Sequence, residues 1–220
     1  SCQFQSRKGY SDPMIGQNRP LQPLTEIRCF MLDMDGTFYL GEKLFPWSLG
    51  FIETLQKLGI GYLFLTNNSS KDRYLYAEKI SRMGLLVSEE QVLTSGEATA
   101  IYMEGRYPGK RPFVAGTPSL LNEFSSRGFT LDDQNPEAVV LGFDTTLTYE
   151  KLWKLCDFVR AGLPYVATHP DINCPTEHGF MPDIGAILAA VTASTGRSPD
   201  IIIGKPNRMI AEAAAKKLDL

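Results

Sequence analysis

Short apolar runs alternate with longer amphipathic stretches along most of this chain. The apolar runs have the length and composition of buried strands, and they lie at 29–32, 61–65, 112–115, 138–141, 165–167 and 201–203. The stretches between them carry apolar residues at helical spacing, and glycines at positions 59, 84, 128 and 162 end four of them. This alternation predicts an α/β protein with a parallel sheet.

Two aspartates follow the first apolar run. The segment Cys29–Leu32 leads directly into Asp33, and Asp35 comes two residues later. Residues i and i+2 of an extended chain point the same way, so both carboxylates could face one site beyond the carboxyl end of the strand, where open α/β sheets bind ligands. Gly36 gives the backbone room to turn, and the Thr37 hydroxyl with nearby N–H groups could hold an anion. Charge at the tip of a buried strand is costly, so the pair predicts a functional site.

Two further predicted strands end in polar groups. The strand at 61–65 is followed by TNN at 66–68, and the strand at 201–203 by GKP at 204–206, a cation just before a helix N-terminus. Any one of the three motifs alone is more typical of a cap or a turn. All three in order, each after an apolar strand, favour an anion-binding site over a set of unrelated turns.

These motifs resemble those of a known family. DMDGT at 33–37, TNNSS at 66–70 and GKP at 204–206 resemble motifs I, II and III of the haloacid dehalogenase superfamily. TSGEATA at 94–100, ATHPDINCPTEHG at 167–179 and TGRSPDIIIGKP at 195–206 look like its 4-nitrophenylphosphatase/NagD-type branch. The resemblance covers residues 27–220. It implies a Rossmann-like parallel sheet as core, with an inserted α/β cap domain.

The resemblance also implies the chemistry of the two aspartates. Asp33 would be the nucleophile that forms an aspartyl-phosphate, and Asp35 would be the general acid and then the general base. A second carboxylate close by would raise the pKa of Asp35 and hold its proton near neutral pH. An aspartate at the second position favours a phosphatase or a phosphomutase, and a mutase would usually carry its lid next to motif I. We therefore expect a phosphatase that acts on a small phosphomonoester.

The remaining motif residues would hold the phosphate and a metal. The resemblance implies that Thr66, Asn67 and Gly36 bind the phosphoryl oxygens and that Lys205 neutralises charge on Asp33 and the phosphate. Mg²⁺ prefers oxygen ligands, and the Asp33 carboxylate with the main-chain carbonyl of Asp35 would supply two of them.

The same resemblance divides the chain into parts. We expect an N-terminal extension at 1–26, a core built from 27–89 and 199–220, and a type IIA cap at 90–198. The cap would exclude water and select the leaving group. Its segment around His169 and Asp171 would reach toward the substrate; the alternative for His169 is a turn residue whose polar atoms are satisfied by neighbours.

One element of the family pattern is missing. Motif IV, a strand ending in Gly-Asp with a second acid, should complete the Mg²⁺ site beyond Lys205, but the sequence stops at Leu220. We expect the core to lack its C-terminal strands through truncation, and residues 1–220 alone to show poor Mg²⁺-dependent turnover. The alternative is a catalytically inactive protein that binds a phosphorylated ligand or another protein.

Composition and charge limit the classes of partner and the cellular location that we expect. The chain has 43% hydrophobic and 21% charged residues, a net charge of −3 and no long Lys/Arg stripe, so we expect no nucleic-acid partner. No apolar run approaches the ~20 residues of a membrane span, and no secretory h-region is present, so we expect a cytoplasmic protein. A receiver domain also pairs acids with Thr and Lys, but the long 90–198 insertion does not fit one. The expected partner is a small phosphorylated metabolite, and the cap could form a homodimer.

Overall fold

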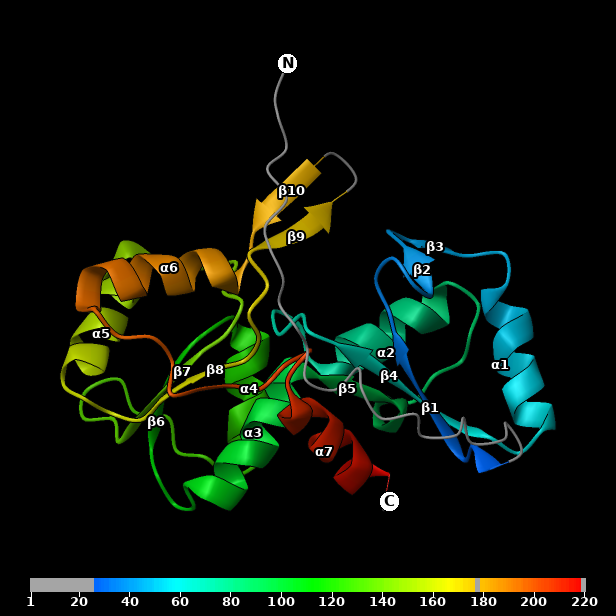
Figure 1. Cartoon of the computed structure of the whole chain (residues 1–220), viewed down its shortest axis with the longest axis horizontal. Helices are drawn as coiled ribbons and strands as arrows, with labels where there is room; N and C mark the ends of the chain where they lie inside the picture. The colour runs from blue at the N-terminus through cyan, green and yellow to red at the C-terminus, as the bar shows by residue number, and fades with distance from the viewer. Residues whose placement is uncertain (1–25, 177–178, 219–220) are drawn as a thin grey trace, which may run out of the picture.

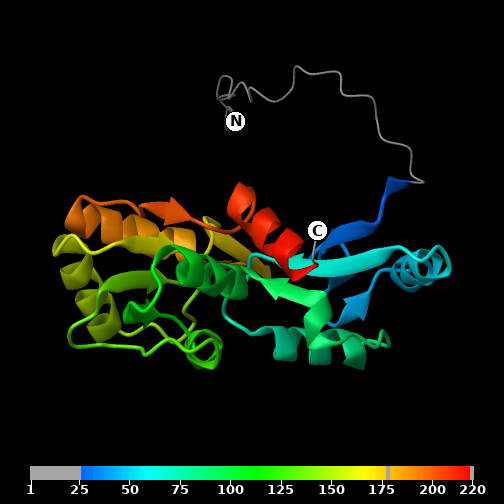
Figure 2. The ribbon, with the colours of Figure 1, turned by 90° about the horizontal axis from the view of Figure 1, so that it is seen from below.

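Two parallel sheets lie side by side in an elongated molecule (Figures 1 and 2). The computed structural model describes residues 26–176 and 179–218. The first sheet has the order β1-β4-β5 and the second the order β11-β8-β7-β6, and every pair is parallel. Their strands are β1 (Cys29–Asp33), β4 (Gly61–Thr66), β5 (Val92–Thr94), β6 (Pro112–Ala115), β7 (Ala138–Leu141), β8 (Tyr165–Ala167) and β11 (Ile201–Ile202). The predicted α/β class is confirmed.

Helices connect the strands and cover both sheets. They are α1 (Ser48–Lys57), α2 (Arg73–Arg82), α3 (Ser95–Arg106), α4 (Pro118–Ser126), α5 (Tyr149–Arg160), α6 (Ile184–Thr195) and α7 (Arg208–Lys217), with a short 3₁₀ helix η2 (Glu89–Gln91) before β5. Threonine side chains cap three of them: Thr94 accepts from the Glu97 N–H, Thr117 from the Leu120 N–H and Thr148 from the Lys151 N–H. Asn207 is a different case, because its side-chain amide donates to the Gly204 carbonyl instead of capping α7.

Two short antiparallel hairpins stand outside the sheets. One joins β2 (Tyr39–Leu40) to β3 (Lys43–Leu44), and the other joins β9 (Asn173–Thr176) to β10 (Gly179–Pro182). The sequence predicts a polar loop through the second hairpin, and this prediction is wrong. Both strands contain a proline, Pro175 and Pro182, and their side chains are mainly exposed, so the usual signals of a strand are absent.

The strand pairing differs from the expected boundaries of core and cap. The expected cap begins at 90, yet β5 pairs with β4 in the first sheet. The expected core resumes at 199, yet β11 pairs with β8 in the second sheet. Backbone hydrogen bonding therefore moves both strands to the other side of the proposed division. The division into a core and an inserted cap stays a prediction.

Three clusters of buried side chains hold these elements together. One lies in the first sheet against α1 and α2, and another in the second sheet against α5 and α6. The third spans both sheets: Leu65 and Leu93 of the first pack in it with Val140 and Ile203 of the second. Helix α7 adds Ile210 to this shared cluster, and Figure 1 shows the helix where the two sheets meet. The relative position of the sheets is thus set by packing.

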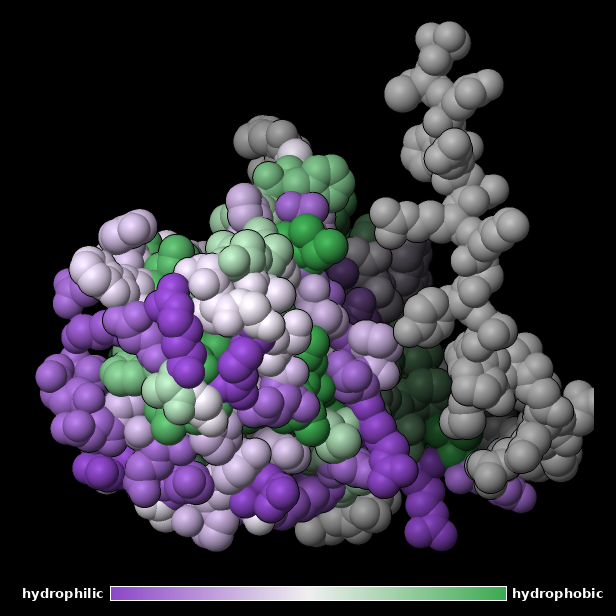
Figure 3. All heavy atoms as spheres, turned by 60° about the vertical axis from the view of Figure 1, so that its left-hand side comes forward, coloured by the Kyte–Doolittle hydropathy of each residue, from purple (hydrophilic) through white to green (hydrophobic). Residues whose placement is uncertain are grey.

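The surface over the second sheet is mixed in polarity. Figure 3 shows polar side chains interspersed with separate apolar patches on this face. The most exposed aromatics of α5 are Tyr149 and Trp153, which contact each other edge to face. In the part of the chain that the structure describes, no helix has both the length and the apolar character needed to cross a bilayer.

Candidate active site

Asp33 lies at the carboxyl end of β1, where the sequence predicts it. It is the last residue of the strand and pairs in register with Leu65 of β4. The Thr37 hydroxyl donates to its Oδ2 at 3.1 Å, and the Lys205 ammonium contacts its Oδ1. Both partners of this ion pair keep a third or more of their side-chain surface exposed, so the nucleophile proposed from sequence is accessible and held beside a cation.

Lys205 reaches Asp33 from the other sheet. The sequence predicts that its strand runs beside the first two, but β11 belongs to the second sheet. The two motifs meet because the sheets lie with these strand ends together, as the side-chain contact between residues 172 positions apart requires. Gly204 allows the close approach: a Cβ there would lie 2.6 Å from His169 Cβ and 2.7 Å from Asn67 Oδ1. Only glycine fits at that position without displacing a neighbour.

Asp35 is about as exposed as Asp33 but has different neighbours. The buried Tyr39 hydroxyl donates to its Oδ2 at 3.2 Å, and Lys79 Nζ lies 3.9 Å from its Oδ1. Burial raises the pKa of Asp35, partly offset by Lys79 and Tyr39, while the charge of Asp33 raises it to a lesser extent. The predicted rise in the pKa of Asp35 agrees with this environment. Its main cause is burial, however, and not the second carboxylate that the sequence suggests.

Gly36 serves the turn after β1. Its φ of 78° lies in the left-handed region, and its N–H donates to the Tyr39 carbonyl at 2.8 Å. The expectation that Gly36 binds phosphate is therefore not supported, because its donor is already used inside the turn.

Thr66 ends β4 and Asn67 follows it, and both line the same pocket as the two aspartates. The Thr66 hydroxyl accepts from the Asn68 N–H at 3.1 Å. The Asn67 amide nitrogen donates to Asp171 Oδ2 at 3.0 Å and to the Lys205 carbonyl at 3.1 Å, while its Oδ1 accepts from the Lys205 N–H at 2.7 Å. Asn67 thus joins three segments: its own loop, the Lys205 loop and the segment that carries Asp171.

Asp171 and His169 lie in different environments, although the sequence places both toward the substrate. Asp171 lines the same pocket as Asp33. His169 is fully buried: its Nε2 lies 3.0 Å from Asp183 Oδ1 and its Nδ1 3.0 Å from Thr168 Oγ1. The expectation of a substrate-facing His169 is therefore wrong, because the turn residue's ring nitrogens are satisfied by neighbours.

We call the cavity at these strand ends the carboxylate pocket. It encloses about 170 Å³, and within the described part of the chain its charged lining is Asp33, Asp35, Asp171, Asp183 and Lys205. The acids outnumber the base, so an incoming phosphate would meet net negative charge. A hard divalent cation would remove this conflict, and the Asp33 carboxylate beside Asp35 offers the oxygen donors that Mg²⁺ accepts.

Sequence reasoning missed three groups in or behind this pocket. Asp183 precedes α6, and its side chain accepts from the Ile184 N–H, so an aspartate before an apolar helix was the available signal. Tyr39 and Lys79 contact Asp35 from a hairpin and from α2, and nothing local in the sequence marks them. The Tyr39 contact is formed within the turn that follows β1, four residues along the chain, whereas the Lys79 contact arises from the tertiary fold.

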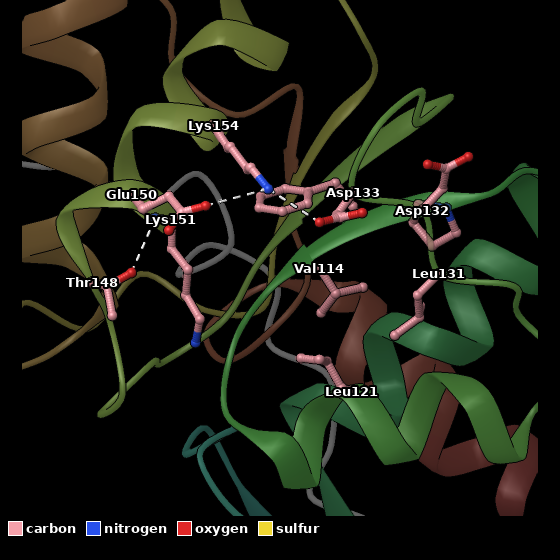
Figure 4. Close-up of a pocket in the computed structure, with 11 residues that line it drawn as sticks. Val114, Leu121, Leu131, Asp132, Asp133, Thr148, Glu150, Lys151 and Lys154 are labelled. Atoms are coloured by element: carbon pink, nitrogen blue, oxygen red, sulfur yellow. Dashed lines mark hydrogen bonds and ion pairs between the residues drawn. The ribbon is translucent and has the colours of Figure 1, made fainter.

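A second cavity of about 500 Å³ lies against β6; we call it the β6 pocket. Its floor includes Val114 and Leu121, and its rim carries Lys151 and Lys154 (Figure 4). Lys154 contacts Asp133 at 3.1 Å, and Lys151 Nζ lies 2.8 Å from Asp144 Oδ2. These pairings neutralise its lysines and leave the pocket without the chemistry seen around Asp33.

Comparisons with known proteins converge on one group. The family model described as haloacid dehalogenase-like hydrolase matches residues 30–130. An acid sugar phosphatase of Staphylococcus saprophyticus is 37% identical over 194 residues, which are 88% of this chain and 74% of the relative. The 5'-nucleotidase YutF of Bacillus subtilis is 35% identical over 189 residues, 86% of this chain and 73% of the relative.

Solved structures agree with these relatives. A protein described as a putative nagD protein is 49% identical with a TM-score of 0.86, and the match covers 88% of this chain and 77% of that one. A 4-nitrophenylphosphatase from Thermotoga maritima also has 49% identity and a TM-score of 0.86, covering 89% and 75%. A glycerol phosphate phosphatase from Mycobacterium tuberculosis, solved with calcium, has 30% identity and a TM-score of 0.82, covering 89% and 58%.

Proposed function

This chain belongs to the NagD-type branch of the haloacid dehalogenase-like hydrolases, and from this premise we propose that it hydrolyses a small phosphomonoester through an aspartyl-phosphate on Asp33. The observation that carries the proposal is the Asp33–Lys205 contact beside Asp35 in the carboxylate pocket. Its relatives are named as phosphatases and a nucleotidase, which supports a phosphomonoesterase.

The proposed first step transfers the phosphoryl group to the enzyme. An Asp33 carboxylate oxygen attacks phosphorus, the bond from phosphorus to the ester oxygen breaks, and Asp35 gives its proton to the departing alkoxide. Burial raises the pKa of Asp35 and so keeps more of it protonated for this role. Lys205 offsets the charge that gathers on Asp33 and the phosphoryl oxygens.

The second step returns the enzyme to its starting state. A water oxygen attacks phosphorus, Asp35 takes the water proton, and the acyl-phosphate bond to Asp33 breaks to release inorganic phosphate. Thr66 lies next to this centre, and we propose that its hydroxyl holds a phosphoryl oxygen.

A divalent cation completes the proposal. When bound, Mg²⁺ would neutralise the phosphoryl oxygens and the surplus acids, held by the Asp33 carboxylate and the main-chain carbonyl of Asp35. The sugar, nucleotide, nitrophenyl and glycerol phosphates named for the relatives form the natural substrate panel. A cytoplasmic location and a homodimer through the cap remain predictions, the second checked by the mass of the protein in solution.

The experiment compares leaving groups. Phosphate release by the protein is measured with Mg²⁺ and with EDTA, using 4-nitrophenyl phosphate and glycerol phosphate. An alkoxide leaves poorly without a proton, so Asp35→Asn should slow glycerol phosphate hydrolysis much more than nitrophenyl phosphate hydrolysis.

Two outcomes would contradict the proposal. An equal loss for both substrates would remove Asp35 as the general acid. Binding of phosphate esters with no release from any form of the protein would favour the inactive binding protein instead.

A further inference from the structure

A line of four buried polar side chains runs behind the carboxylate pocket. Ser69 Oγ lies 2.9 Å from Thr168 Oγ1, Thr168 Oγ1 lies 3.0 Å from His169 Nδ1, and His169 Nε2 lies 3.0 Å from Asp183 Oδ1. None of the four is more than 3% exposed. We call this line the buried relay. It begins in the loop after β4, passes the end of β8 and stops at the first turn of α6.

The hydrogens of the buried relay can be placed in one direction. In the tautomer that matches these contacts, the His169 Nε2–H donates to the Asp183 carboxylate and Nδ1 accepts a hydrogen bond. The Thr168 hydroxyl supplies that proton, and the Ser69 hydroxyl donates to Thr168. Ser69 Oγ in turn accepts from the Phe143 N–H at 2.9 Å. Each member is therefore satisfied, as a buried polar network requires.

The relay lies directly against the residues that form the site. The Gly204 N–H donates to the Thr168 carbonyl at 2.7 Å, so the Lys205 loop rests on the relay backbone. Ser95 Oγ lies 3.3 Å from His169 Nδ1 and donates to the carbonyl of Asn67. Two residues after His169, Asp171 meets the Asn67 amide. A shift of the imidazole would be felt by all three loops.

A structural metal is a weaker explanation of the same residues. Ligand atoms of His169, Asp171 and Asp183 all lie within 4.8 Å of one another. Each, however, already has a hydrogen-bond partner inside the protein. His169 and Asp183 bond to each other, and Asp171 accepts from Asn67. The hydrogen bonds account for the grouping without an ion.

We propose that His169 is a positioning residue, which through the buried relay holds Asn67 and Asp171 in the arrangement that the reaction at Asp33 needs. This inference rests on the proposed phosphatase function. It assigns His169 no contact with substrate, and it explains why a fully buried imidazole sits between the loop after β4 and α6.

The test uses His169→Gln, whose amide nitrogen can reproduce the Nε2–H donor to Asp183 but leaves the Nδ1 side without a partner for Thr168. Val191→Ala is the matched control: Val191 is fully buried on the same helix that Asp183 begins, but it belongs to the apolar cluster of the second sheet. Both variants are measured below their unfolding temperatures.

Two readouts separate positioning from general stability. We expect His169→Gln to lower kcat about tenfold or more with a small change in KM, because misplaced groups mainly cost transition-state geometry. We also expect the side-chain amide resonance of Asn67, identified by its loss in Asn67→Asp, to move in His169→Gln and not in Val191→Ala.

Each contrary result has a defined meaning. Wild-type kcat in a folded His169→Gln would overturn the inference, whether or not the Asn67 resonance moves. A lower kcat with an unmoved Asn67 resonance would overturn the route through Asn67. Failure of the proposed function would look different, since the wild-type protein itself would then release no phosphate.

Discussion

The two pockets of this molecule differ in the balance of their charges. The β6 pocket encloses about 500 Å³ and the carboxylate pocket about 170 Å³. In the larger one, Lys151 and Lys154 each face a carboxylate partner. In the smaller one, the described lining holds four acids and a single lysine, and Asp35 has a second cation, Lys79, outside the lining. A pocket whose charges are not compensated by its own surroundings can attract a phosphate and a cation. The balance of charge, and not the volume, therefore favours the carboxylate pocket as the candidate active site.

The largest expected effect is a difference in kcat between two substitutions, one of an acid in each pocket. Asp33→Asn removes the proposed nucleophile and should lower kcat for phosphate release by more than about 1,000-fold. Asp133→Asn in the β6 pocket removes only an exposed partner of Lys154 and should leave kcat within about twofold. Steady-state phosphate release checks both, and equal losses in the two variants would erase the distinction between the pockets.

The lysines of the two pockets should differ in what they support. Loss of Lys205 should mainly reduce activity, and loss of Lys151 should mainly reduce stability. Lys205→Met should lower kcat about 100- to 1,000-fold, as for the loss of a group that offsets transition-state charge. Its contact with Asp33 is partly solvated, so the free energy of unfolding should change by about 1 kcal/mol or less.

Lys151→Met is the counterpart in the β6 pocket. It leaves the buried Asp144 carboxylate without its cation and should reduce the free energy of unfolding by about 1–3 kcal/mol while kcat is kept. Urea denaturation and phosphate release measure the two quantities. A stable, inactive Lys151→Met would show that the β6 pocket takes part in the reaction.

The smallest expected effect is on stability. The contributions of two carboxyl groups, Asp35 and Asp132, to the free energy of unfolding should change with pH in opposite directions. Burial raises the pKa of Asp35, so the folded state holds its proton longer and stability falls as pH rises through the window above the unfolded value. Backbone N–H groups of Asn135 and Gln134 lower the pKa of Asp132 in the β6 pocket, so its contribution is present at neutral pH and is lost as pH falls.

Substituting each carboxyl group tests that sign. At pH 7, Asp35→Asn should raise Tm, and Asp132→Asn should lower it. The difference should shrink toward zero when melting is repeated at acidic pH, where both carboxyl groups are protonated. Shifts of the same sign at pH 7 would mean that the environments of the two pockets do not differ as described.

Local pattern was enough to predict much of this site. Asp33 ends one strand, Asp35 lies two residues beyond it and Thr66 ends another, so the apolar runs before them predicted where they lie. The three-residue strand β5 is too short to stand out, which is why the expected boundary near 90 misplaced it. Lys205 was placed correctly beside Asp33, although its strand pairs in the other sheet.

Burial of single polar residues could not be predicted in the same way. His169 lies in a polar, proline-containing segment that reads as an exposed loop, yet it is fully buried because β8, α3 and α6 enclose it. Lys79 of α2 reaches Asp35 only through tertiary packing, and no spacing in the sequence encodes this contact. Tyr39 is closer along the chain and reaches Asp35 through the turn that follows β1.

The central claim is that Asp33 becomes phosphorylated during turnover. The most direct measurement is acid quenching of the protein during hydrolysis of a phosphomonoester with Mg²⁺, followed by mass spectrometry of the peptide that contains Asp33. We predict a peptide carrying one added phosphoryl group on Asp33 in the wild type, and none in Asp33→Asn. Phosphate release by the wild type with no phosphorylated Asp33 at any quench time, or a phosphoryl group on another residue, would contradict the account.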